Sequence, residues 1–88
     1  MAPKLDLFTD DELLSALAAY PSAPSVRLFI DGGVRRIHAG RWDAKETRFN
    51  AKNEYTDVRE GPGYIAAVFY DADAKCDAFV IARVQVSS

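Results

Sequence analysis

The sequence has 88 residues, of which 49% are apolar and 27% are charged, with 11 basic side chains against 13 acidic ones. This length predicts one domain over residues 1–88, and the ordinary apolar fraction and mixed charge argue against disorder. The single cysteine excludes an internal disulfide framework. Because no apolar run approaches the roughly 20 residues of a membrane span or forms a signal-peptide core, we expect a cytoplasmic protein.

The first predicted element is a helix of about three turns. Thr9 and Glu12 have the spacing of a capping box, in which the Thr hydroxyl accepts a helical N–H and the Glu side chain returns to the cap. Apolar residues follow at helical spacing: Leu13, Leu14, Leu17 and Ala18. Pro21 and Pro24 predict that the helix ends near Tyr20.

A hairpin follows the helix. Val26, Leu28 and Ile30 alternate with polar or aromatic neighbours, which is the period of a strand. The Asp-Gly-Gly turn at 31–33 and the extended pattern of 34–42 complete it. Residues 43–60 show no clear apolar periodicity, which leaves two interpretations open: a long loop carrying a short strand, or a short helix from Ala44 onward.

Two apolar strands are predicted after the break at 61–63. They cover 64–70 and 76–86, and the polar turn 71–75 joins them. The fold class is therefore α+β, with one N-terminal helix packed on a four- to five-stranded antiparallel sheet built from two hairpins.

Both faces of the last hairpin are apolar. One face of its second strand carries small residues and is expected to meet the helix: Cys76, Ala78, Val80, Ala82, Val84 and Val86. Phe79 and Ile81 lie on the opposite face, which one helix cannot also cover. Either the sheet curls, so that the first hairpin and the segment around Phe49 and Tyr55 form a second layer, or another chain covers it.

No constellation in the sequence predicts catalysis. Cys76 falls on an apolar face, where a thiol behaves as a small hydrophobe, and His38 has no suitable nucleophile beside it. Asp71 and Asp73 resemble the start of a calcium loop, but Lys75 occupies the next ligand position. One His and one Cys give no metal-site spacing. We therefore expect a protein that is not an enzyme and has no metal or cofactor.

The charge is unevenly distributed along the chain. Residues 1–26, 27–59 and 60–88 carry net charges of −3, +3 and −2. The basic middle is interleaved with aromatic residues, and its candidate anion or nucleic-acid contacts are Arg35, Arg36, His38, Arg41 and Arg48. The alternative is a solvated face whose arginines pair with Asp31, Asp43 and Glu46.

The leading functional hypothesis is a small non-enzymatic protein–protein interaction or structural subunit. It would self-associate as a homo-oligomer or dock onto a larger assembly through its sheet, as a virion-type accessory component or as a small inhibitor of another protein. The candidate interface residues are Ile65, Phe69, Phe79, Ile81 and Trp42. The alternative hypothesis is a nucleic-acid-binding module that uses the Arg-rich central hairpin.

Overall fold

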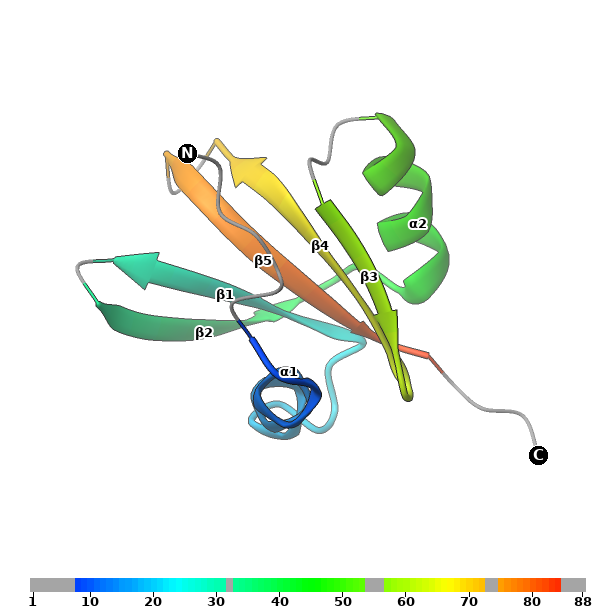
Figure 1. Cartoon of the computed structure of the whole chain (residues 1–88), viewed down its shortest axis with the longest axis horizontal. Coiled ribbons are helices and arrows are strands. Elements are labelled where there is room, and N and C mark those ends of the chain that lie inside the picture. The colour runs from blue at the N-terminus through cyan, green and yellow to red at the C-terminus, as the bar shows by residue number, and fades with distance from the viewer. Residues whose placement is uncertain (1–7, 32, 54–56, 73–74, 85–88) are drawn as a thin grey trace.

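The computed structural model describes residues 8–31, 33–53, 57–72 and 75–84. Its elements are α1 (Asp10–Ala18), β1 (Ser25–Asp31), β2 (Val34–Gly40), α2 (Ala44–Asn53), β3 (Asp57–Gly61), β4 (Tyr64–Asp71) and β5 (Cys76–Arg83). The five strands form one antiparallel sheet in the order β2-β1-β5-β4-β3 (Figure 1). The predicted α+β class, with a helix near the N-terminus packed on an antiparallel sheet, is confirmed.

Helix α1 begins at the predicted capping box. The Thr9 hydroxyl accepts the Glu12 N–H at 3.2 Å, and the Glu12 carboxylate accepts the Thr9 N–H at 3.0 Å. The hydrogen bond from the Thr9 backbone, followed by the one from Arg35, lowers the pKa of Glu12 below its usual value. These contacts satisfy N–H groups that a helix start leaves without partners.

Two arginines from the sheet hold the two ends of α1. The helix has no basic residue in its last turn, and Arg83 of β5 supplies that charge by donating to the carbonyls of Leu17 at 2.6 Å and Tyr20 at 2.8 Å. A cation is favourable there because the helix end leaves carbonyls unpaired. At the other end, Arg59 of β3 donates to the Asp10 carboxylate at 2.6 Å.

The start of α1 is also tied to β4. The Tyr64 hydroxyl donates to the Asp10 carboxylate, and this hydrogen bond, together with Arg59, lowers the pKa of Asp10. Burial, followed by the hydrogen bond to Asp10, raises the pKa of Tyr64 to about 12. The hydroxyl therefore keeps its proton and remains the donor.

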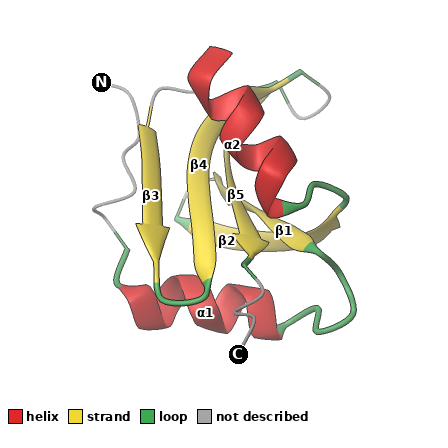
Figure 2. Cartoon of the chain, turned by 90° about the vertical axis from the view of Figure 1, so that its right-hand side faces the viewer, coloured by secondary structure: helices red, strands yellow, loops and turns green. Residues whose placement is uncertain are grey.

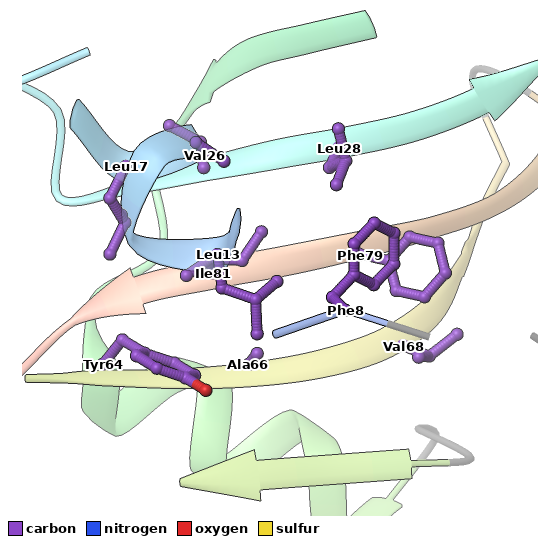
Figure 3. Packing of buried hydrophobic residues seen from close by; sticks show 11 residues of the cluster. Phe8, Leu13, Leu17, Val26, Leu28, Tyr64, Ala66, Val68, Phe79 and Ile81 are labelled. Atoms are coloured by element: carbon purple, nitrogen blue, oxygen red, sulfur yellow. The ribbon is translucent and has the colours of Figure 1, made fainter. Parts of the chain in front are cut away.

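The side of the sheet that faces α1 holds large side chains. Phe8, Leu13 and Leu17 lie on this face of the sheet, and the Phe8 and Phe79 rings meet edge to face with centroids 5.0 Å apart (Figure 3). The strands contribute the other buried members of this cluster: Val26, Leu28, Tyr64, Ala66, Val68, Phe79 and Ile81. Burial of this cluster is the main term that fixes α1 on the sheet.

Helix α2 covers the opposite face. Asp43 caps it, because its carboxylate accepts the Glu46 N–H at 2.8 Å and its carbonyl accepts the hydroxyl of the buried Thr47 at 2.9 Å. The helix packs against β4 and β5 (Figure 2). The buried apolar residues that β4 and β5 place on this face are Ile65, Ala67, Ala78, Val80 and Ala82. The undecided segment therefore contains both a helix and a strand, β3.

The sequence-based assignment of helix to face was wrong. Helix α1 lies over the face of Phe79 and Ile81, and the small residues of β5 face α2. Strand alternation separates the two faces but does not say which helix covers which, because both faces are apolar. Of the two alternatives for covering both faces, the chain itself supplies the second layer, because the segment that contains Phe49 forms α2 and packs on β4 and β5.

The break at 61–63 is the turn of a further hairpin. Gly61 pairs with Tyr64, and Pro62 and Gly63 occupy the two central positions of the turn. Gly63 has a φ of 81°, a conformation that glycine adopts without steric cost. The turn joins β3 to β4 and so places β3 at the edge of the sheet.

Candidate binding surface

Three of the five predicted interface residues lie inside the core of the chain. Ile65, Phe79 and Ile81 are 0%, 2% and 0% exposed. Phe79 and Ile81 face α1, whereas Ile65 lies on the face that α2 covers. They therefore offer no docking surface on the folded chain, which corrects the sequence-based assignment: a second helix, rather than a second chain, covers the hydrophobic sheet.

The other two predicted interface residues lie together at the edge of the α2 layer. The Trp42 and Phe69 rings are in contact, with centroids 5.2 Å apart and planes tilted by 37°. Both side chains are only partly buried. Trp42 precedes α2 and Phe69 belongs to β4, so the pair joins residues that are distant in the sequence.

These two rings form one wall of a groove of about 410 Å³. The groove is lined by Ser25, Arg27, Ala39, Gly40, Arg41, Trp42, Phe69 and Val80. Most of the other lining side chains are small, and α2 packs on β4 and β5 rather than on the first hairpin. We call this feature the hairpin groove, because β1 and β2 contribute most of its strand residues.

The position of Trp42 depends on an absent side chain at Gly40. Ser25 and Gly40 are register partners on β1 and β2, and the Ser25 hydroxyl accepts the Trp42 N–H at 3.1 Å. A Cβ at Gly40 would lie 2.5 Å from that hydroxyl oxygen. Glycine at this position therefore allows the buried Ser25 to hold Trp42 at the groove wall.

Arg27 is the groove residue that the predicted contact set missed. Its guanidinium reaches across β5 and donates to the Asp71 carboxylate at 3.0 Å, with 39% of the Arg27 and 6% of the Asp71 side chain exposed. Within the described part of the chain, its buried Nε–H has no hydrogen-bond partner. The sequence signal that could have identified Arg27 is the strand alternation, which places it on the same face as Ser25 and Phe29.

The predicted cationic residues are divided between different surfaces. Arg35 lies on the α1 side, where it pairs with Glu12 at 2.9 Å and sits over the Phe8 ring. Arg48 lies on α2 and pairs with Glu60 of β3 at 2.7 Å. For both arginines, and for Arg27, the carboxylate partner is a residue outside the basic stretch 27–59, whereas the Asp43 carboxylate caps α2.

The remaining predicted cations lie on the groove side. Arg36 and His38 are the register partners of Phe29 and Arg27, and the His38 ring meets the Phe29 ring edge to face at 5.6 Å. Arg41 is exposed and lines the groove. A basic surface with aromatic neighbours therefore runs along β2 and into the hairpin groove.

Strand β2 is an open edge of the sheet. Among the residues that the structure describes, it pairs with β1 alone, over seven residues, and most of its side chains are exposed. Val34 at its start is 59% exposed. The strand contains no proline, so its backbone can pair with an added strand, although the Ile37 carbonyl already accepts the Tyr20 hydroxyl at 3.2 Å.

The described residues contain no group of three His, Cys, Asp or Glu side chains arranged to hold a metal ion. Cys76 opens β5 opposite Asp71, whereas His38 lies on β2 opposite Arg27. Neither described helix has the length and apolar character needed to cross a membrane.

No protein-family model, curated protein sequence or solved structure matches this chain. Its function must therefore be inferred from the geometry of its own surfaces.

Proposed function

We propose that the chain is a non-enzymatic docking module that accepts an extended, acidic segment of a partner protein along the open edge of β2. The observation that carries the proposal is the combination of a seven-residue edge strand, which β1 pairs on one side within the described sheet, with basic side chains. An extended segment can add to such an edge through backbone hydrogen bonds, while its side chains supply the specificity.

The charges of the edge favour an acidic segment. Arg36 and His38 flank the edge on the groove side, whereas Arg35 on the α1 side is already paired with Glu12. An added strand would place alternate residues beside Arg36 and His38. Cross-strand pairs of opposite charge stabilise a sheet, whereas like charges directly opposite destabilise it.

A second copy of this chain is a less favourable occupant. Antiparallel pairing of β2 with β2 would bring two basic strands together, which opposes the self-association predicted from the sequence. The proposal therefore favours a different protein as the partner. An accessory subunit of a larger assembly and a small inhibitor of another protein both satisfy this requirement.

The test uses the full chain and a labelled peptide of alternating Glu and Val that is as long as β2. We expect saturable binding by fluorescence polarisation. A peptide of the same length in which proline replaces one central Val should not bind, because proline cannot continue the backbone hydrogen-bond ladder. A peptide of alternating Lys and Val should bind much more weakly.

Charge-reversed variants locate the binding site. Arg36→Glu should weaken binding about tenfold, because it replaces an attraction by a repulsion across the strands. Arg48→Glu makes the same change in charge on α2 and should leave binding unchanged. Equal binding of the acidic and proline peptides, or sedimentation that shows a stable homodimer, would contradict the proposal.

A further inference from the structure

The hairpin groove has the dimensions of a small-molecule site. Its volume of about 410 Å³ lies within the roughly 300–1,000 Å³ range of ligand pockets. Several lining residues are small, and one wall is aromatic. This site is separate from the backbone edge of β2 and does not depend on the docking proposed above.

The aromatic wall suits a flat ligand group. Trp42 is partly buried, its backbone is held by Ser25, and its ring is braced by Phe69 at 5.2 Å. A ring fixed in this way can accept a planar group without losing much conformational freedom. Nucleobases stack on aromatic side chains regardless of sequence, because every base has a π-face.

The groove also carries an excess of positive charge. Arg27 and Arg41 line it. Of these two arginines, Arg27 forms an ion pair with the buried Asp71 and Arg41 does not. Within the described residues Arg41 has no ion pair, and 39% of the Arg27 side chain is exposed beside its ion pair with Asp71. A guanidinium group has five N–H donors in a planar fork that matches phosphate oxygens.

We infer that the hairpin groove binds a nucleotide unit of single-stranded nucleic acid, with the base against Trp42 and the phosphate at Arg41 and the exposed side of Arg27. An acidic peptide would match the arginines but would lack the flat group that the aromatic wall fits.

The chain contains its own reporter for this inference, because Trp42 is the single tryptophan. We expect an oligothymidylate of about ten nucleotides to quench its fluorescence in a saturable way. The affinity should fall steeply with added salt, because phosphate contacts release counterions. Inorganic phosphate at the same concentrations should cause little quenching, because it has no base.

Matched substitutions test the two halves of the site. Arg41→Ala should weaken oligonucleotide binding about tenfold and reduce the salt slope by about one. Arg48→Ala removes the same side chain near the opposite edge of the sheet and should change neither quantity. Trp42→Leu should also weaken binding about tenfold, measured by polarisation of a labelled oligonucleotide, whereas Trp42→Phe should retain most of it.

Three results would overturn the inference, provided that circular dichroism shows an intact fold. They are the absence of quenching by the oligonucleotide at low salt, equal effects of Arg41→Ala and Arg48→Ala, and quenching by the Glu-Val peptide in competition with the oligonucleotide. Arg36→Glu separates the two proposals, because it should weaken peptide binding at the β2 edge while the oligonucleotide still quenches Trp42 in the groove.

Discussion

The two faces of the sheet use arginine in different ways. On the α1 face, Arg35, Arg59 and Arg83 all bond to the helix or to the segments that flank it. On the α2 face, Arg41 stands at the open groove and Arg27 shares its guanidinium between Asp71 and the groove. An arginine is therefore structural where a helix reaches across the sheet to it, and available to a ligand where the helix does not reach.

The two faces also differ in the size of their buried side chains. The α1 face interlocks large groups such as Phe79, Leu13 and Tyr64, whereas β4 and β5 present small residues such as Ala67 and Ala78 to α2. The α1 face should therefore be sensitive to the loss of volume. The α2 face should be sensitive to its gain.

The largest effect is expected from Phe79→Ala. It removes a ring that is 2% exposed and in contact with Phe8, so we expect a loss of about 3–5 kcal/mol in the free energy of unfolding. Urea unfolding followed by circular dichroism measures it. Tyr70→Ala is the control, because this ring is 63% exposed, and its effect should stay within about 0.5 kcal/mol. Similar losses for the two variants would contradict the assignment of Phe79 to the core.

An intermediate effect is expected from Ala67→Leu on the α2 face. The larger side chain has no free space between β4 and α2, so we expect a loss of about 1–3 kcal/mol from overpacking. The same urea experiment applies. Ala18→Leu, at an exposed position of α1, is the matched control and should be nearly neutral. A stabilised Ala67→Leu protein would show instead that the interface under α2 is loosely packed.

The smallest effect is expected from the raised pKa of Tyr64, and it appears only in alkaline solution. The pKa of Tyr64 is raised from 10.0 to about 12, so the folded state binds this proton more tightly than the unfolded state does. The resulting stability is complete below pH 10.0 and is lost as the pH rises towards about 12. Tyr64→Phe should remove this alkaline loss, as measured by urea midpoints across the pH range.

Asp10 gives the opposite sign at the acid end. Its pKa is lowered from 3.8, so its contribution to stability is present above that pH and is lost as the pH falls through the lower value of the folded state. Tyr64→Phe should raise the pKa of Asp10, which carboxyl NMR titration can follow. An unchanged Asp10 titration would show that the hydroxyl does not act on this carboxylate.

Local chemistry allowed most elements to be predicted from the sequence. The Thr9 to Glu12 capping box and the strand alternation around Val26 each depend on neighbours a few residues away. Helix α2 stayed undecided between a helix and a loop because its apolar pattern is weak, although Asp43 and Glu46 have the spacing of an N-cap and the structure shows that cap.

The candidate binding surface could not be predicted in this way, because it depends on contacts between residues that are distant in the sequence. Strand alternation could not assign a helix to each face, so the buried Phe79 and Ile81 were predicted as an interface. The partnership of Arg27 with Asp71 and the contact of Trp42 with Phe69 depend on β5 lying between β1 and β4. Strand order of this kind leaves no short-range trace in the sequence.

The central place of β5 has a consequence for the folding of the nascent chain. β1 and β4 each pair with β5 and not with one another, and Ser25 is the register partner of Ala82. During synthesis, the β1–β2 and β3–β4 hairpins can form first, but isolated two-stranded ribbons are only marginally stable. The two hairpins cannot join into one sheet until residues 76–83, which form β5, have left the ribosome. Until then, the two hairpins expose apolar side chains such as Val26 and Val68 that are buried in the complete sheet.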